Sequence, residues 1–353
     1  MDQEANHPEA ALREAVTLND VAREAGVSPS TVSRVINGTA RVNARKREAV
    51  LKAIERLNYR PNLMAKGLAQ GRSLTVGVVT QEISSPYYGE MLKGVEQALE
   101  QTPYHPIFAS GHWRADQEEA ALKVLVDRQV DALIVMDGSV PEERLLELSQ
   151  QMPVVVVGRE IAGLNCLSID NFQGAHQAIR HLIELGHRRI AHIAGPKSHP
   201  DAVERLKGYK AALAEAGLPY DPSLVVEGDY LEPSGLLAVE ALLARGALFT
   251  AIFAANDQMA YGASVALYRR GIRIPHDVSL VGFDDLPSSN YFSPPLTSVR
   301  QPGQEMGWEA ARWVLAMLKG QSYTPRPLST RLVVRESTGF LRSPGSRLMH
   351  QTS

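Results

Sequence analysis

The sequence predicts a small all-α head followed by an α/β core of two doubly wound parallel-sheet lobes. Two observations carry this prediction. Helical periodicity gives way at about residue 74 to short β-rich runs that alternate with amphipathic helices, and the basic residues concentrate before that point. The chain has 353 residues, of which 44% are apolar, so it can bury more than one hydrophobic core. We therefore expect a chain of several domains.

Charge divides the chain into two unlike parts. Residues 16–72 include eleven basic and four acidic residues, a net charge of +7, whereas the whole chain carries −2. Everything outside this segment therefore carries −9. A small basic head on an acidic body indicates a polyanionic partner for the head alone.

Three short helices are predicted in the head. Apolar residues recur at helical spacing over 18–25, and a glycine follows as a stop signal. Ser28 is a good N-cap and Pro29 suits the first helical position, which predicts a second helix over 29–37. A third helix is expected over about 44–58. The tight turn between the first two helices predicts a helix-turn-helix.

The second helix has two unlike faces. Five residues fall within an arc of roughly 140° at about 100° per residue, opposite an apolar face: Pro29, Ser30, Ser33, Arg34 and Asn37. Hydroxyl, guanidinium and amide groups hydrogen-bond base edges and phosphates in a major groove. The plainer alternative, a small solvated helical hairpin, leaves the charge of +7 unexplained. We therefore expect this face to contact DNA.

Eight strands are predicted in the core. They are Leu74–Val79, Pro106–Ala109, Ala132–Met136, Val154–Val157, Ile190–Ala194, Leu224–Val226, Ala251–Ala254 and Ser279–Phe283. The two halves of this region look like weak internal repeats, each with a strand, a helix and another strand. We therefore expect two similar lobes with a cleft between them.

Polar residues just after the predicted strands are candidates for a ligand site, since ligands of open α/β folds bind beyond the carboxyl ends of the strands. This rule selects Ser84, Ser85, Arg159, Asp170, Asn256 and Asp284, with the aromatic residues Tyr87, Tyr88, Trp113, Phe172, Tyr230 and Phe283 nearby. Such groups suit a polyol, because the polar ones bond hydroxyls and a ring covers the apolar side of a pyranose. Tyr87 and Tyr88 are equally compatible with hydrophobic residues at a helix start.

Catalytic, metal and membrane signatures are absent from the sequence. The motifs GxGxxG, GxSxG and HExxH do not occur. The single cysteine, Cys166, rules out an intramolecular disulfide and a cysteine-based zinc site. Four histidines recur every five or six residues, which scatters them instead of gathering them on a metal: His176, His181, His187 and His192. We expect no enzyme activity, cofactor or metal, a cytoplasmic location, and disordered polar tails at 1–15 and 341–353.

The chain resembles the lactose-repressor (LacI/GalR) family. The resemblance to that family's DNA-binding head and hinge runs almost unbroken through VTLNDVAREAGVSPSTVSRVINGTARVNARKREAVLKAIERLNYRPNLMAKGLAQGRS. In the core it continues in GYKAAL, FAANDQMAYGA and VGFDDLPSSNYFSPPLTSV. It implies a helix-turn-helix domain at 16–61, a hinge helix at 62–72 and a two-lobed effector-binding and dimerisation core at 73–340, similar to periplasmic binding proteins.

The resemblance also implies a set of DNA-binding residues. Pro29, Ser30 and Arg34 sit where the family reads bases. Thr17, Ser28, Thr31, Ser33 and Asn37 sit where it mainly meets phosphate. In the hinge, Asn62 caps a segment too short to be stable alone, and Leu68 aligns with the residue that wedges the minor groove. Thr31 is equally compatible with an ordinary helix residue, and Leu68 with packing against the core.

In the core, the resemblance sharpens the choice of effector residues. Arg205, Asn256 and Asp284 match polar ligands of the family, and Tyr230 matches a stacking aromatic. The full expected set is Tyr87, Tyr88, Arg159, Asp170, Arg205, Tyr230, Asn256 and Asp284. For Asp257 and Asp285 we expect structural roles as caps.

The function implied is that of a homodimeric transcriptional regulator that binds double-stranded operator DNA and is controlled by a small sugar-like effector. Repression follows from the habit of the family, and an activator remains an alternative. A sugar-capturing protein of the periplasmic class would need a signal peptide and no basic head. The effector is compatible with an inducer or a corepressor.

Overall fold

The computed structural model describes residues 16–37, 42–59 and 72–341. Most of the expected hinge and nearly all of both expected tails lie outside the described residues. The chain divides into two compact units, Met1–Ser73 and Leu74–Ser353, the head and the core. Within the described parts of both, every helix is too short or too polar to cross a membrane.

The described part of the head contains three helices: α1 (Leu18–Ala25), α2 (Pro29–Asn37) and α3 (Ala44–Arg56). The first two have the predicted bounds, and the third ends two residues earlier than predicted. Each helix contributes a fully buried valine, Val21, Val32 and Val50, to one small core. Gly26 ends α1 in the left-handed conformation that the tight turn requires, with φ of 62°. The predicted helix-turn-helix is confirmed.

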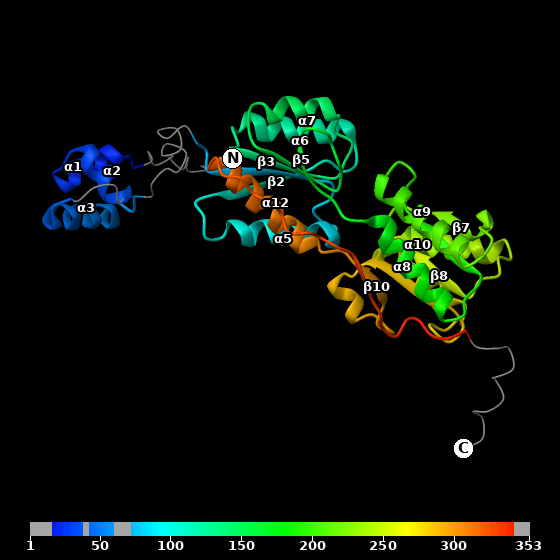
Figure 1. The fold of residues 1–353 in the computed structure, drawn as a ribbon. Helices are drawn as coiled ribbons and strands as arrows, with labels where there is room; N and C mark the ends of the chain where they lie inside the picture. Colours follow the sequence, from blue (N-terminus) through cyan, green and yellow to red (C-terminus); the bar gives the residue numbers. More distant parts are fainter. Residues whose placement is uncertain (1–15, 38–41, 60–71, 342–353) are drawn as a thin grey trace, which may run out of the picture. The chain divides into compact units, whose positions relative to one another are not determined.

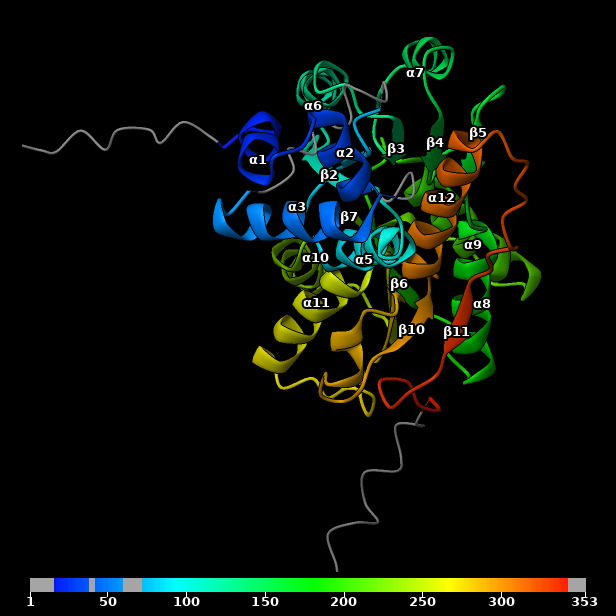
Figure 2. The same cartoon turned by 90° about the vertical axis from the view of Figure 1, so that its left-hand side faces the viewer.

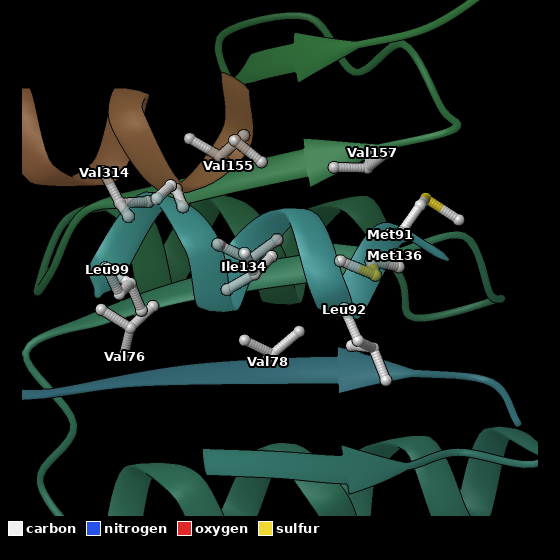
Figure 3. Close-up of a cluster of buried hydrophobic side chains, with 14 of the residues drawn as sticks. Val76, Val78, Met91, Leu92, Leu99, Ile134, Met136, Val155, Val157 and Val314 are labelled. Atoms are coloured by element: carbon white, nitrogen blue, oxygen red, sulfur yellow. The ribbon is translucent and has the colours of Figure 1, made fainter. Parts of the chain in front are cut away.

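Lobe 1 of the core is a parallel sheet in the order β2-β1-β3-β4-β5. Its strands are β1 (Thr75–Thr80), β2 (His105–Ser110), β3 (Ala132–Met136), β4 (Val154–Val157) and β5 (Asn165–Leu167). Helices α5 (Pro86–Leu99) and α12 (Gly303–Leu318) pack on one face, and α6 (Ala115–Asp127) and α7 (Glu142–Ser149) on the other (Figure 1). Figure 3 shows how alternate strand residues, among them Val78 and Ile134, meet the α5 side chains.

Lobe 2 is a sheet in the order β11-β10-β9-β8-β6-β7. Its strands are β6 (Ile190–Ala194), β7 (Val225–Glu227), β8 (Ala251–Ala254), β9 (Ser279–Asp284), β10 (Thr297–Arg300) and β11 (Arg331–Val333). Helices α8 (Asn171–Glu184) and α9 (Pro200–Glu215) cover one face, and α10 (Glu232–Ala244) and α11 (Asp257–Arg269) the other. All pairings are parallel except β10 with β11, which lie side by side in Figure 2.

The chain passes between the lobes three times: from β5 to α8, from β10 to α12, and from α12 to β11. Helix α12 therefore completes lobe 1 although it lies near the end of the chain. It approaches α5 closely at two glycines, since a methyl group at Gly307 would collide with the carbonyl oxygen of Met91, and one at Gly94 with that of Gln304. The lobes are thus interleaved in sequence and pack as one unit.

All eight predicted strands are present, each with bounds within one residue of the prediction. Strands β5, β10 and β11 were not predicted. They have only three or four residues, and β10 reads Thr-Ser-Val-Arg, without a run of apolar side chains. Leu341, expected to begin the C-terminal tail, donates its backbone N–H to the carbonyl of Leu185. The predicted fold class of a helical head and two α/β lobes is confirmed.

Candidate functional site

A cavity of about 330 Å³ lies between the two lobes of the core. It is lined by Glu82, Ser85, Tyr87, Tyr88, His112, Trp113 and Asp137 of lobe 1, and by Pro196, His199, Asp201, Arg205, Asp229, Tyr230, Leu231, Asn256, Gln258, Asp284 and Gln301 of lobe 2 and its crossover. These residues follow the carboxyl ends of β1, β2 and β3 in one sheet and of β6 to β10 in the other. The volume lies within the range of small-molecule sites.

Arg205 is the buried cation of this cavity. It lies on α9 and is 3% exposed. Its Nη2 lies 3.3 Å from Asp201 Oδ2, its Nε donates to Asn171 Oδ1 at 2.9 Å, and its Nη1 donates to the Ala255 carbonyl at 2.5 Å. The guanidinium carbon lies 3.9 Å from the centre of the Phe283 ring. Burial opposes the charge, but the neighbouring tyrosine and carboxylates raise the pKa of Arg205 above its ordinary value. The guanidinium is therefore held charged and in one orientation.

A polar chain joins the two lobes through the crossover that follows β10. The Tyr87 hydroxyl of lobe 1 donates to Gln301 Oε1 at 3.3 Å, and Gln301 Nε2 donates to Asp284 Oδ1 of lobe 2 at 2.6 Å. Burial raises the pKa of Asp284 well above its ordinary value, although the nearby Arg205 lowers it. Gln301 therefore links the positions of two residues that a ligand would contact.

The lobe 1 wall combines aromatic rings with two carboxyl groups, those of Glu82 and Asp137. The Tyr88 hydroxyl donates to Asp137 Oδ2 at 2.9 Å. Burial, and then the charge of Asp201, raise the pKa of Asp137 to about 7. Trp113 stacks on His199 of lobe 2 with ring centres 3.9 Å apart, and burial lowers the pKa of that histidine against the opposing effect of Asp201. Rings from both lobes thus meet across the cavity.

Tyr230 and Asn256 complete the lobe 2 wall. The Tyr230 hydroxyl donates to Asp201 Oδ2 at 3.0 Å. Asn256 Oδ1 accepts from the backbone N–H of Met259 at 2.9 Å as the N-cap of α11, and its Nδ2 donates to the Tyr230 carbonyl at 2.8 Å. Asn256 therefore lines the cavity and caps a helix at once.

The capping roles expected for Asp257 and Asp285 are wrong, although both residues are structural. Asp257 is fully buried and accepts from the Leu286 backbone N–H and from two serine hydroxyls, while the cap of α11 is its neighbour Asn256. Asp285 forms an ion pair with Arg335 at 2.6 Å. Neither aspartate lines the cavity.

Unusual backbone conformations concentrate at the cavity. Nine described non-glycine residues have positive φ, and five of them line it: His112, Trp113, Asp137, Tyr230 and Asp284. Such conformations are sparsely populated for residues with side chains and cluster at functional sites, where the surrounding structure holds them. This concentration supports the cavity as the candidate functional site, independently of its volume and polarity.

Six of the eight expected effector residues line the cavity, and two do not. Tyr87 and Tyr88 lie in the first turn of α5 and line the cavity, and their contact with an effector stays a prediction. Arg159 instead donates from both Nη atoms to the Val140 carbonyl at 3.1 Å, and Asp170 caps α8 by accepting from the Gln173 N–H. These two residues lie away from the cavity because β4 and β5, which they follow, lie on the other side of β3 from β1 and β2.

Several lining residues were missed, among them Asp137, His199, Asp201 and Gln301. Asp137 comes directly after predicted strand β3, so the strand-end rule already contained the signal that would have found it. Gln301 follows β10, which was not predicted. Of the other strand-end candidates, Ser85 and Trp113 line the cavity.

The head presents the expected face of α2. Pro29, Ser30 and Arg34 are exposed, whereas Val32 on the opposite side is fully buried. Ser28 caps the helix, since its Oγ accepts from the Thr31 backbone N–H at 3.3 Å. The amphipathic pattern predicted for this helix is therefore confirmed, whereas contact of its polar face with DNA stays a prediction.

Thr17 and Thr31 have local structural roles. Thr17 forms a capping box with Asp20 at the start of α1, and the Thr31 hydroxyl lies 2.9 Å from the Ser28 hydroxyl. The hydrogen bond between these two hydroxyls supports the interpretation of Thr31 as an ordinary helix residue. Ser33 is half-buried. The Asn37 side chain, Asn62 and Leu68 lie outside the described parts of the chain.

Comparisons with known proteins match both units. The family described as "Periplasmic binding proteins and sugar binding domain of LacI family" matches residues 73–334, and "Bacterial regulatory proteins, lacI family" matches residues 17–62. Catabolite control protein A of Priestia megaterium is 40% identical over 329 residues, which cover 92% of this chain and 99% of that protein.

Solved structures extend the similarity to three dimensions. A complex of the transcriptional regulator CelR with cellobiose is 38% identical, covers 91% of this chain and 99% of its own, and has a TM-score of 0.68. A lac repressor dimer bound to operator and an anti-inducer is 30% identical, covers 92% and 100%, and has a TM-score of 0.83. Both similarities extend over the head and the core of this chain.

Proposed function

Since the chain belongs to the LacI family of bacterial regulatory proteins, we propose that it represses transcription by binding operator DNA through its head, under the control of a sugar held between the lobes of its core. The observation that carries the proposal is the cavity, where a buried Arg205, a carboxyl group of Asp284 and aromatic rings converge.

The chemistry of the cavity suits a sugar. Asp284 and Asn256 offer oxygen and nitrogen atoms to hydroxyl groups, and the guanidinium fork of Arg205 can donate to more than one of them. Tyr230 and Trp113 offer ring faces to the apolar side of a pyranose. The similar regulator CelR forms a complex with cellobiose, which supports a sugar as the ligand of this cavity.

DNA binding is assigned to the polar face of α2. Pro29, Ser30 and Arg34 are the proposed base contacts, and residues 16–72 carry a net charge of +7 for the phosphates. One head covers only a short half-site, so we infer a homodimer on a pseudo-palindromic operator, as supported by the lac repressor dimer bound to operator. The protein acts in the cytoplasm without catalysis or a cofactor.

The two sites communicate through the hinge. A sugar that changes how the lobes meet alters the spacing of the two hinges of a dimer, which must fold side by side in one minor groove. Asn62 caps this hinge and Leu68 supplies its wedge, by the family resemblance of the sequence.

One arginine variant and one lysine variant test the proposed DNA contacts. Operator is selected from random DNA with the full chain, and binding is measured by fluorescence anisotropy at several salt concentrations. Arg34→Ala should lose discrimination between operator and random DNA by about 1–3 kcal/mol, whereas Lys66→Ala should weaken both about equally and flatten the salt dependence. If Arg34→Ala lowers the affinity for operator and for random DNA by the same factor, base reading by α2 is contradicted.

A further inference from the structure

The cavity is rich in carboxyl groups. Five of them line it: Glu82, Asp137, Asp201, Asp229 and Asp284. Among the described lining residues, the basic groups are one guanidinium, that of Arg205, and two imidazoles, those of His112 and His199. Carboxyl groups therefore outnumber the one permanent cation five to one. The question is whether any positive charge is left for an anionic ligand.

The charge of Arg205 is already matched within the protein. Asp201 Oδ2 lies 3.3 Å from its Nη2, and the Asp201 side chain is 30% exposed against 4% for that of Arg205. Two further N–H groups of the guanidinium donate to Asn171 and Ala255, and one ring face of Phe283 covers it. The remaining N–H groups can donate to a hydroxyl, but no unpaired charge remains there for an anion.

The two histidines do not supply a cation either. His112 Nδ1 lies 3.2 Å from Glu82 Oε2, so any charge on this ring is matched by that carboxylate. His199 stacks on Trp113, and burial lowers its pKa, which keeps the ring neutral at pH 7. Neither imidazole can therefore neutralise an incoming phosphate.

Four helix starts lie at the cavity and carry partial positive charge, since the N-cap residues of α5, α9, α10 and α11 line it. Three of these helices have an acidic residue in the first turn that offsets the dipole: Asp201 in α9, Glu232 in α10 and Asp257 in α11. Helix α5 begins at Pro86 with a first turn free of acidic residues, and it contributes about half a unit charge at most. Burial shifts Asp284 towards its neutral form and raises the pKa of Asp137 to about 7, so that Asp137 is mostly ionised at pH 7.5. Half a charge at one end of the cavity does not balance Asp137 together with the carboxyl groups of Glu82, Asp201 and Asp229.

We propose that the cavity selects an uncharged sugar and rejects the phosphorylated or carboxylated form of the same sugar. The inference rests on the proposed function, because it concerns the same site. A phosphate or carboxylate placed among these carboxyl groups meets like charge in a partly buried setting, where repulsion weakens binding about tenfold or more. Hydroxyl groups meet acceptors with free lone pairs instead.

Calorimetry on the full chain tests the selection directly. Four sugars serve as probes, glucose, galactose, ribose and cellobiose, each beside its phosphate ester at pH 7.5. We expect at least one neutral sugar to bind and its phosphate ester to bind at least about tenfold more weakly. The double variant Asp137→Asn with Asp229→Asn should narrow this ratio about threefold or more, since both amides keep an acceptor oxygen while losing the charge. A sugar phosphate that binds as tightly as its neutral form overturns the proposal.

Fluorescence quenching tests the charge of the cavity without any sugar. Trp113 lines the cavity and is 38% exposed. Its fluorescence emission is obtained by subtracting the emission spectrum of the Trp113→Phe variant from that of the natural protein. Caesium should quench this emission more strongly than iodide, and stronger quenching by iodide overturns the proposal. If caesium quenches more strongly but none of the eight probes binds, the sugar assignment of the proposed function fails while the charge selection stands.

Discussion

The two lobes build unlike walls for one cavity. The lobe 2 wall is a closed polar network in which Arg205, Asp201 and Tyr230 already satisfy one another. On the lobe 1 wall, rings of Trp113 and Tyr88 surround the half-buried carboxyl group of Asp137, which accepts a hydrogen bond from the Tyr88 hydroxyl. We therefore expect lobe 2 to be preorganised for hydrogen bonding, and lobe 1 to cover the ligand and set the local charge.

The largest effect is expected at Arg205 of the lobe 2 wall. Arg205→Ala removes the donors of the wall and leaves Asp201 without its partner, so we expect sugar affinity to fall at least about 100-fold and the free energy of unfolding to fall by about 3–5 kcal/mol. Calorimetry and urea denaturation measure the two effects. Arg205→Lys keeps the charge but not the planar fork, so its sugar affinity and stability should lie between those of the natural protein and of Arg205→Ala. If the sugar affinity of Arg205→Ala lies within threefold of that of the natural protein, the lobe 2 wall does not dominate binding.

The next effect is a pH dependence located in lobe 1. The pKa of Asp137 in the folded protein is about 7, above the ordinary 3.8, so the folded state binds more protons than the unfolded state between these values. Its contribution to stability is therefore complete at low pH and is lost as pH rises towards 7. Between pH 5 and 7 we expect a loss of about 2 kcal/mol from this residue, at up to about 1.4 kcal/mol per pH unit.

Asp137→Asn isolates this contribution, because the amide does not titrate. Urea denaturation of both proteins at pH 5, 6, 7 and 8 should show that the variant loses less stability as pH rises. Equal slopes for the two proteins contradict the assignment and would make the lobe 1 wall electrostatically inert.

A smaller effect is expected at the crossover that joins the walls. Gln301→Ala removes the donor to Asp284 and the acceptor of Tyr87, so sugar affinity should fall about tenfold, by about 1–2 kcal/mol. Gln304→Ala, three residues further along, breaks only an exposed hydrogen bond to Gln97 and serves as the matched control. Equal calorimetric affinities for the two variants mean that Gln301 does not position the site.

The smallest effect is expected from the aromatic cover of lobe 1. Trp113→Ala removes one ring face, which is worth about 0.5–1.5 kcal/mol, so sugar affinity should fall only several-fold. Trp113→Phe should retain most of the affinity. If Trp113→Ala costs as much affinity as Arg205→Ala in the same titration, the contrast between the walls disappears.

Predicted and missed residues occur on both walls, since Tyr87 and Tyr88 of lobe 1 were expected and His199 and Asp201 of lobe 2 were missed. Arg205, Tyr230, Asn256 and Asp284 of lobe 2 were all expected at the site and line the cavity. In lobe 1 the strand-end rule selected Arg159 and missed Asp137, although each directly follows a predicted strand or its glycine. The order of strands in the sheet decides between them, and that order results from tertiary packing and not from local periodicity.

Long-range connectivity explains the other misses. Gln301 follows a four-residue strand with mixed polar side chains, and such a strand acquires its identity from pairing with β9 and β11. Helix α12 is amphipathic in sequence, but nothing local to it indicates that it packs on α5, about 200 residues earlier. The helices of the head were predictable because their caps and spacing are local.

The central claim is that a ligand in the cavity controls DNA binding by the head. Its most direct test is fluorescence anisotropy of selected operator DNA with the full chain, with and without the neutral sugar that binds best in the panel above. The natural protein should change its operator affinity about tenfold with sugar, in either direction. Asp284→Ala should keep the sugar-free operator affinity and change it less than about twofold when sugar is added. If Asp284→Ala responds to the sugar like the natural protein, the controlling site lies elsewhere and the account is wrong.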